Sequence, residues 1–300
     1  MKAIQSGLVI LTFLFSLKLA GQKTEIQYLS GTDKDHPVKW DFYCTNGRNS
    51  GYWTKINVPS NWELEGFGSY LYGNVNKNVN ETGIYRYEFR VPVKWKNKTV
   101  YIVFEGSMTD TEVKINGKPA GETHRGAFYR FKYDITDLLD FRGTNLLEAT
   151  ITKESFDESI NRAERIADYW VFGGIYRPVY LEAVPPQFIE RVAIDARADG
   201  SFTMDVFTGG SGKAGKVSAQ IFDIGGKTFG HSMIADIKGD ERKTVLRGSF
   251  NEPALWNPEF PNLYQVIVNL YEGKRVVHSY CQKLGFRTVE IREGDGLYVN

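Results

Sequence analysis

Apolar and polar residues alternate in short runs along most of this 300-residue chain. Clear examples are Tyr85–Val91, Val100–Gly106 and Asn145–Ile151, where apolar positions recur with a period of two. That period places successive side chains on opposite faces of a β-strand, so these runs predict half-buried strands. The later runs Lys216–Asp223 and Tyr264–Tyr271 continue the pattern. The chain is therefore predicted to be all-β.

Turn signals separate these runs, and the sequence has no long segment with helical periodicity. Asn116–Gly117 lies between two strand-like runs, and both residue types tolerate the positive φ that a tight hairpin turn requires. The stretch Asp134–Leu139 (DITDLL) favours a single capped helical turn. Many short strands with regularly spaced turns are typical of β-sandwiches.

Pro185–Pro186 is the best candidate for a domain boundary, because a strand pattern ends there and a proline pair stiffens the link. Residues 22–185 are predicted to form a jelly-roll-like β-sandwich, and residues 186–288 an immunoglobulin-like β-sandwich. The glycine-rich stretch Gly209–Lys216 is then a flexible connection inside the second domain. Residues 289–300 are expected to begin a connection to a further domain, with a hairpin interrupted at Val299–Asn300.

Residues 1–21 have the pattern of a secretory signal peptide. Lys2 supplies a positive charge, Leu8–Phe15 is a short apolar run, and the small residues near Ala20 or Gly21 offer a cleavage site. The apolar run is shorter than the roughly 20 residues that a membrane-spanning helix needs. The alternative is a buried N-terminal strand. We therefore expect a periplasmic or secreted protein, with no membrane contact after cleavage.

Composition and charge narrow the possible functions. The formal net charge is +1, which provides no electrostatic footprint for nucleic acid. Aromatic residues make up 14% of the chain, a content that favours strands and surfaces that stack on flat ligands. Cys44 and Cys281 fall in different predicted domains, so two buried free thiols are favoured over a disulfide bridge.

The sequence offers no motif for a cofactor or a metal ion. The four histidines are scattered, and no pair of them has metal-ligand spacing. The Gly-rich stretch at Gly209 lacks the following helix of a phosphate loop. A G-x-S-x-G nucleophile elbow is also absent. We expect no cofactor and no metal site.

Seven segments occur in order along the chain: Val58–Gly68, Thr82–Pro92, Phe104–Glu122, Tyr133–Leu139, Asp168–Leu181, Leu255–Tyr264 and Gly285–Arg292. Each is a weak signal alone. Together, at matching spacings, they resemble the N-terminal half of glycoside hydrolase family 2, which contains β-galactosidases, β-glucuronidases and β-mannosidases. The resemblance covers nearly all of residues 25–300.

The resemblance implies a sugar-binding jelly-roll domain, then an immunoglobulin-like domain, then a TIM barrel with two catalytic glutamates. The barrel would follow residue 300 and is missing from this chain, so no catalytic residue is assigned. The segments Asn251–Pro253 (NEP) and Asn80–Thr82 (NET) resemble barrel motifs. The first, however, lies between sandwich strands, and the second is expected to lead into an edge strand. The chain alone is expected to be inactive, although the full-length family members are retaining glycosidases.

The resemblance also implies that the first domain reaches the barrel's active site with an asparagine and an aspartate. The family's Tyr-x-Asn-Val loop matches YGNV and gives Asn74. The aspartate before its W-x-x-G-I-R turn matches Asp168. Both are substrate-binding predictions, because a carboxylate accepts hydrogen bonds from sugar hydroxyls and a carboxamide both donates and accepts. The alternative for Asp168 is a salt bridge to Arg165 or Arg177.

Trp170 follows Asp168 by two positions, which would place both on one face of a strand. It is a third substrate-binding candidate, as a platform for the apolar face of a sugar, or else a residue of the sandwich core. Gly173–Gly174 predicts a turn that excludes a Cβ atom, braced by Arg177. Trp62 is expected to be a core anchor.

The favoured function is therefore the non-catalytic N-terminal portion of an exported, β-galactosidase-like hydrolase. Its partners would be a carbohydrate substrate and its own barrel. The sugar itself stays open, because the acidic run that precedes the aspartate in β-galactosidases of the family is missing here. Two alternatives are a free-standing carbohydrate-binding, lectin-like protein and an adhesion protein built from two sandwiches.

Overall fold

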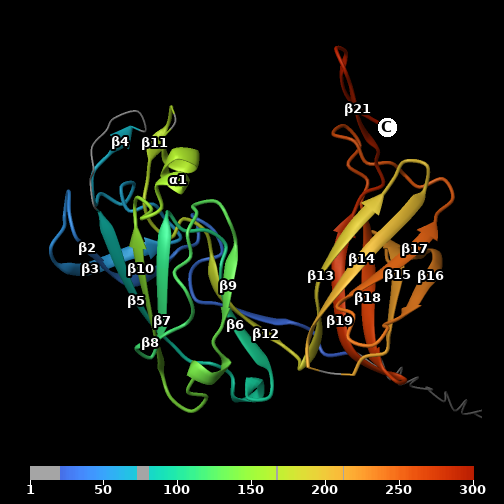
Figure 1. The fold of residues 1–300 in the computed structure, drawn as a ribbon, viewed down its shortest axis with the longest axis horizontal. Helices are drawn as coiled ribbons and strands as arrows, with labels where there is room; N and C mark the ends of the chain where they lie inside the picture. Colours follow the sequence, from blue (N-terminus) through green and yellow to red (C-terminus); the bar gives the residue numbers. More distant parts are fainter. Residues whose placement is uncertain (1–20, 73–80, 167, 212) are drawn as a thin grey trace, which may run out of the picture. The chain divides into compact units, whose positions relative to one another are not determined.

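The structure is a computed structural model that describes residues 21–72, 81–166, 168–211 and 213–300 (Figure 1). The predicted signal peptide, apart from Gly21, and the candidate Asn74 lie outside these residues. The described chain divides into two compact units. The first unit comprises residues 23–190 and 208–213, and the second comprises residues 21–22, 191–207 and 214–300.

The first unit is a β-sandwich. Within the described residues one sheet has four strands, in the order β1 (Glu25–Tyr28), β12 (Val179–Val184), β6 (Thr99–Phe104) and β9 (Phe131–Asp134). The facing sheet has six in the same ranges, in the order β3 (Trp53–Val58), β2 (Val38–Cys44), β5 (Thr82–Phe89), β10 (Asn145–Thr152), β7 (Asp110–Ile115) and β8 (Lys118–Pro119). Neighbouring strands run antiparallel, as in a jelly-roll-like fold.

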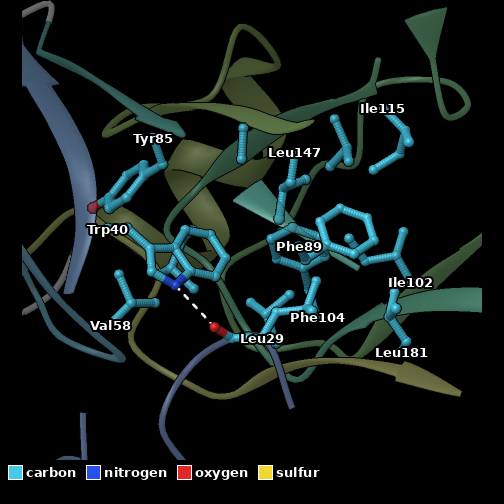
Figure 2. Close-up of a cluster of buried hydrophobic side chains, with 14 of the residues drawn as sticks. Leu29, Trp40, Val58, Tyr85, Phe89, Ile102, Phe104, Ile115, Leu147 and Leu181 are labelled. Atoms are coloured by element: carbon cyan, nitrogen blue, oxygen red, sulfur yellow. Dashed lines mark hydrogen bonds between the residues drawn. The ribbon is translucent and has the colours of Figure 1, made fainter. Parts of the chain in front are cut away.

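The core of the first unit lies between these two sheets. Strand β10 buries every second side chain, and Leu147, Ala149 and Ile151 all face inward. Ile102 on β6 and Leu181 on β12 meet them from the opposite sheet (Figure 2). Burying an aliphatic side chain of this size contributes about 1.5–3 kcal/mol relative to leaving it exposed. The period of two in the sequence thus produces the inner face of a sandwich.

Trp40 shows how a polar atom is accommodated in this core. Its side chain is fully buried, and its Nε1 donates to the carbonyl oxygen of Leu29 at 3.0 Å (Figure 2). Trp62 is also fully buried, which confirms its prediction as a core anchor. A small third sheet, β4 (Leu71–Tyr72) paired with β11 (Trp170–Val171), lies at one end of the sandwich (Figure 1).

Short helical segments connect the strands of the first unit. They are η1 (Val93–Trp95), η2 (Thr136–Leu138), α1 (Glu158–Ile160) and the π-helical turn η3 (Asn161–Arg165). The predicted helical turn is confirmed at η2, but its N-cap residue Ile135 makes no side-chain cap, and Asp134 instead accepts a hydrogen bond from the backbone of Thr136. The hairpin prediction is confirmed as well, because Asn116 and Gly117 both have positive φ between β7 and β8. No helix of the described residues is long and apolar enough to cross a membrane.

The second unit is an immunoglobulin-like sandwich. Within the described residues one sheet has the order β13 (Gln187–Ala196), β14 (Ser201–Gly210) and β17 (Lys243–Ser249). The other has the order β16 (Thr228–Asp236), β15 (Lys216–Asp223), β18 (Tyr264–Glu272) and β19 (Arg275–Leu284). Its core includes a cluster of packed rings formed by Phe202, Phe229, Phe250, Tyr264 and Phe286.

Four expectations differ from the structure. The stretch Gly209–Lys216 is not all a flexible connection, because Gly209 and Gly210 end β14 and Lys216 begins β15. The hairpin near the end is closed rather than interrupted, since β20 (Val289–Arg292) pairs with β21 (Gly296–Val299). Strand β5 is central rather than an edge strand, because β2 and β10 flank it. Both cysteines are free, but only Cys44 is buried, whereas Cys281 is exposed.

Candidate functional site

Four aromatic side chains lie around the small sheet of β4 and β11. We call this group the aromatic platform; it consists of Tyr70, Tyr72, Trp170 and Phe172. Trp170 lies opposite Tyr72 in the strand pair, and Val171 lies opposite Leu71. The side chains of Leu71 and Val171 are buried, so the alternation of the strands turns Tyr72 and Trp170 outward.

The rings of the platform meet edge to face. The centroid of Trp170 is 5.2 Å from that of Tyr72 and 5.9 Å from that of Tyr70, with interplanar angles of 81° and 90°. Tyr70 contacts Phe172 in the same way, and Arg48 lies over the Tyr70 ring at 4.9 Å. Even so, Trp170 keeps 50% of its surface exposed and Tyr70 keeps 44%. Large exposed rings in such a group are typical of a binding surface.

Asp168 lies beside this platform. The hydroxyl of Tyr72 donates to Asp168 Oδ1 at 2.7 Å, and this hydrogen bond raises the pKa of Tyr72. Among the described residues Asp168 makes no ion pair with Arg165 or Arg177, whose guanidinium groups contact Phe172 and Tyr176 instead, so the salt-bridge alternative is wrong. An exposed carboxylate next to exposed rings can accept hydrogen bonds from a ligand whose apolar face packs on the rings.

The core alternative for Trp170 is also wrong, because half of the side chain faces solvent. The physical reason is that β11 is only two residues long and pairs with β4 outside both sheets of the sandwich. The structure therefore brings Asp168 and Trp170 together through their shared neighbour Tyr72. Contact of either residue with a sugar stays a prediction.

The turn after β11 has no room for side chains. A Cβ atom on Gly173 would overlap the ring of Trp62, and Gly174 has a φ of +115°. The backbone N–H of Trp62 and Nδ2 of Asn61 both donate to the carbonyl of Gly173, at 3.2 Å each. The predicted exclusion of Cβ is thus confirmed, and the buried indole of Trp62 is its cause.

Arg165, rather than Arg177, braces this turn. The Arg165 guanidinium is buried and donates to the carbonyl oxygen of Phe172. Burial lowers the pKa of Arg165, because a charged group loses its hydration there. The Arg177 guanidinium instead lies over the ring of Tyr176, and the backbone N–H of Arg177 donates to the carbonyl oxygen of Gly106. The prediction for Arg177 is therefore wrong.

A buried ionic cluster lies beneath the platform, formed by Lys153, Glu63 and Glu81. Lys153 Nζ is 2.7 Å from Glu63 Oε1 and 3.0 Å from Glu81 Oε2, and all three side chains have no exposed surface. Burial raises the pKa of Glu63, since the charged carboxylate is disfavoured away from water. Glu63 also accepts a hydrogen bond from the N–H of Gly173.

These two glutamates are not a catalytic pair. A retaining glycosidase needs two carboxyl groups about 5–5.5 Å apart that both reach the sugar. Glu63 and Glu81 share one ammonium group, but neither has any exposed surface through which a substrate could approach. Glu252 of the NEP segment is exposed on a loop after Phe250. No cluster of potential metal ligands exists among the described residues.

Sequence reasoning did not identify Tyr70, Tyr72 or the buried ionic cluster. Tyr72 belongs to the motif that locates Asn74. Its hydrogen bond to Asp168, however, joins two residues 96 positions apart, which the sequence pattern does not reveal. Glu81 belongs to the NET segment, where a charged residue before a strand is ordinarily solvated. The sequence signal for the cluster of Lys153, Glu63 and Glu81 was weak, because a single sequence does not show which distant charged residues come into contact.

Two family models match adjacent parts of the chain. The sugar binding domain of the glycosyl hydrolases family 2 matches residues 48–185, and a second model of glycosyl hydrolases family 2 matches residues 187–287. This chain belongs to glycoside hydrolase family 2. The aromatic platform and Asp168 lie in the part that matches the sugar binding domain.

Curated relatives carry enzyme names. A beta-galactosidase from Thermoanaerobacter pseudethanolicus is 32% identical over 221 residues, which cover 72% of this chain and 30% of the relative. A beta-glucuronidase from Formosa agariphila is 24% identical over 297 residues, which cover 88% of this chain and 30% of the relative. The chain thus spans about a third of the length of the curated relatives that it matches.

Solved structures share the fold. The beta-glucuronidase of Bacteroides uniformis superposes with a TM-score of 0.71 at 22% identity, covering 92% of this chain and 34% of that chain. A beta-glucuronidase of Bifidobacterium dentium complexed with coumarin-3-O-glucuronide gives a TM-score of 0.72 at 20% identity, covering 93% and 52%. At these identities the likeness establishes the two-sandwich architecture and no more.

Proposed function

We propose that this chain is the non-catalytic N-terminal portion of an exported, retaining β-glycosidase of the β-galactosidase type. The aromatic platform and Asp168 would form one wall of its sugar site. The carrying observation is the exposed carboxylate of Asp168, held by Tyr72 beside the half-exposed indole of Trp170. Rings that pack on the C–H face of a sugar and a carboxylate that accepts from its hydroxyls are complementary to a pyranose.

The charge of Asp168 favours a neutral sugar over a uronic acid. A glucuronate carboxylate bound against Asp168 would meet a like charge, and it would meet an opposite charge only if it turned towards Arg48, which lies over the Tyr70 ring. A galactoside brings only hydroxyls, which can donate to the aspartate. For this reason the proposal follows the relatives named beta-galactosidase rather than those named beta-glucuronidase.

Catalysis in this proposal belongs to a TIM-barrel domain that the resemblance places after these two sandwiches. The chain matches only about a third of the length of its curated relatives. The unmatched remainder of those relatives is long enough to contain such a domain. The two sandwiches would support the barrel and shape the mouth of its active site. Carbohydrate and the barrel are then the two partners of this chain, with no cofactor.

A titration with methyl β-D-galactopyranoside tests the sugar wall. We expect the indole N–H signal of Trp170 to shift with a dissociation constant near or above about 1 mM, because one wall alone gives roughly −4 kcal/mol. Methyl β-D-glucuronide should bind more weakly. No shift with either glycoside would overturn the proposed site, and micromolar binding would instead support a lectin-like protein.

Export rests on the pattern of residues 1–21 and has its own test. Expression in a bacterial host followed by N-terminal sequencing of the mature product should find a start near Gly21 or Gln22. A product that retains Met1 and stays in the cytoplasm would contradict the periplasmic or secreted location.

A further inference from the structure

Lys153 joins parts of the chain that are far apart in sequence. Its ammonium donates to the carbonyl of Ser69 at 2.5 Å and to Glu81 Oε2 at 3.0 Å, and it lies 2.7 Å from Glu63 Oε1. An ammonium has three protons, and these three acceptors account for all of them. The residue follows the last residue of β10, so its backbone is fixed to the six-stranded sheet.

Two of these contacts lead directly to the aromatic platform. Ser69 immediately precedes Tyr70, which begins the platform's first segment. Glu63 accepts from the N–H of Gly173 at 3.0 Å, and Gly173 immediately follows Phe172, which ends the second segment. Tyr70 also donates its hydroxyl to the carbonyl of Glu63 at 3.1 Å. Both halves of the platform are therefore attached to one buried cation.

Stability alone is a poor explanation for this cluster. A buried ion pair gains attraction but loses the hydration of each charge, and apolar replacements of similar size often leave a protein as stable or more stable. Here two carboxylates face one ammonium, and burial raises the pKa of Glu63 accordingly. What an apolar side chain cannot supply is three directed hydrogen bonds, two to the connection that contains Glu63 and Ser69 and one to Glu81.

We propose that Lys153 is a positioning residue that sets the spacing between the Tyr70–Tyr72 and Trp170–Phe172 halves of the aromatic platform. Through that spacing it controls how a sugar ring packs on Trp170. The effect on sugar binding rests on the proposed function, whereas the spacing of the two halves does not. The residue would act through its hydrogen bonds and would not touch the sugar.

The ring contacts of Trp170 provide a direct readout. The ring centroids of Tyr72 and Tyr70 lie 5.2 and 5.9 Å from that of the indole, in edge-to-face geometry. Their ring currents therefore change the chemical shift of Trp170. The experiment labels the chain with 5-fluorotryptophan, assigns the Trp170 signal by its loss in Trp170→Phe, and records fluorine NMR spectra below the melting temperature. The variants are Lys153→Met and the triple variant Lys153→Met/Glu63→Gln/Glu81→Gln.

The triple variant removes all three charges, so it tests the idea even where the single variant fails to fold. The carboxamide that replaces the Glu63 carboxylate can still accept from Gly173, but Ser69 has lost its donor. We expect the Trp170 signal to shift or broaden in both variants. Leu181→Ala, which opens a cavity in the core, is the matched control and should lower stability while leaving the Trp170 signal in place. A wild-type Trp170 signal in the folded triple variant would overturn the proposal.

A second arm adds methyl β-D-galactopyranoside. We expect the triple variant to bind it roughly tenfold more weakly than the wild type, a change of about 1.4 kcal/mol, whereas Leu181→Ala should bind it normally. Equal binding by the triple variant and the wild type would overturn the role of Lys153 in sugar packing. A wild-type chain that ignores the glycoside would overturn the proposed function, and the Trp170 signal alone would then decide the spacing role.

Discussion

Tyr72 and Asp168 lie 96 positions apart in the sequence, yet the hydroxyl of one donates to the carboxylate of the other at 2.7 Å. This hydrogen bond connects the end of β4 with the residues that lead into β11. It fixes a negative charge beside the exposed indole of Trp170, in a part of the chain that matches a sugar binding domain. The bond thereby places a hydrogen-bond acceptor for sugar hydroxyls beside an aromatic ring on which the apolar face of a pyranose can pack.

Asp168→Ala should lower activity without unfolding the protein, when measured in an enzyme that carries the catalytic domain. A hydrogen bond to a charged group contributes about 1.5–3 kcal/mol, which corresponds to a loss of ~10–150-fold in kcat/KM. Because Asp168 is exposed, unfolding free energy should change by no more than about 0.5 kcal/mol. Tyr72→Phe keeps the ring and should lose less activity. A destabilised but fully active Asp168→Ala enzyme would make this residue part of the scaffold.

Gly173→Ala should destabilise the first unit by about 1–3 kcal/mol, because the added methyl group overlaps the buried ring of Trp62. Urea unfolding followed by tryptophan fluorescence measures this loss. Gly215→Ala is the control, since a Cβ there meets nothing within 4 Å, and its effect should stay within about 0.5 kcal/mol. Equal stability of the two variants would contradict the packing described for Trp62.

Glu25→Gln should remove stability that depends on pH. Hydrogen bonds from Lys94 and Lys98 lower the pKa of Glu25 from 4.5 to about 2. The native state therefore holds the charged form more tightly than the unfolded chain does, so this stability is present above pH 4.5 and is lost as the pH falls towards 2. Because the two ion pairs of Glu25 are partly exposed, we expect them to contribute about 1 kcal/mol at pH 7. The difference between wild type and variant should vanish near pH 2 in thermal melts, and a constant difference would contradict the assignment.

Cys281 should react with a thiol reagent in the native protein, and Cys44 should react only on unfolding. Cys281 is exposed, whereas Cys44 is buried and burial raises the pKa of its thiol. Burial keeps the reagent away from Cys44, and the raised pKa reduces the thiolate that would attack it. A colorimetric thiol assay with and without denaturant counts the thiols that react in the native protein and those that react only after unfolding. Cys281→Ser should abolish the reaction of the native protein. Two fast thiols in the native state would contradict the burial of Cys44.

The 300-residue chain should hydrolyse no nitrophenyl β-galactoside. The carboxylates of Glu63 and Glu81, which share the Lys153 ammonium, are buried and out of reach of a substrate. The assay compares purified protein with a mock preparation from the same host. Turnover above the mock preparation that stays with the chain through a second, different purification step would show that the chain is catalytic by itself.

The sandwich could be predicted because its information is local. The alternation of Asn145–Thr152 specifies a strand with one buried face, and Asn116–Gly117 specifies a turn, without reference to distant residues. The site is different. Trp170 was ambiguous between core and surface, since only its pairing with the short β4 turns it outward. Lys153 could not be recognised at all, because its three partners come from other parts of the chain.

Lys153 also affects how the first unit can open. If the segment around Ser69 or the turn at Gly173 detached alone, the ammonium would lose an acceptor or the Glu63 carboxylate a donor while still enclosed by the core. Each charge would keep its ionic partner, but a lost hydrogen bond to a buried charged group costs about 1.5–3 kcal/mol, so such partial opening is disfavoured. The exposed rings of Trp170 and Tyr70 are thereby tied to the global unfolding of the unit. We therefore expect the platform, although it is exposed, to lose its structure only when the whole unit unfolds and not by local fraying.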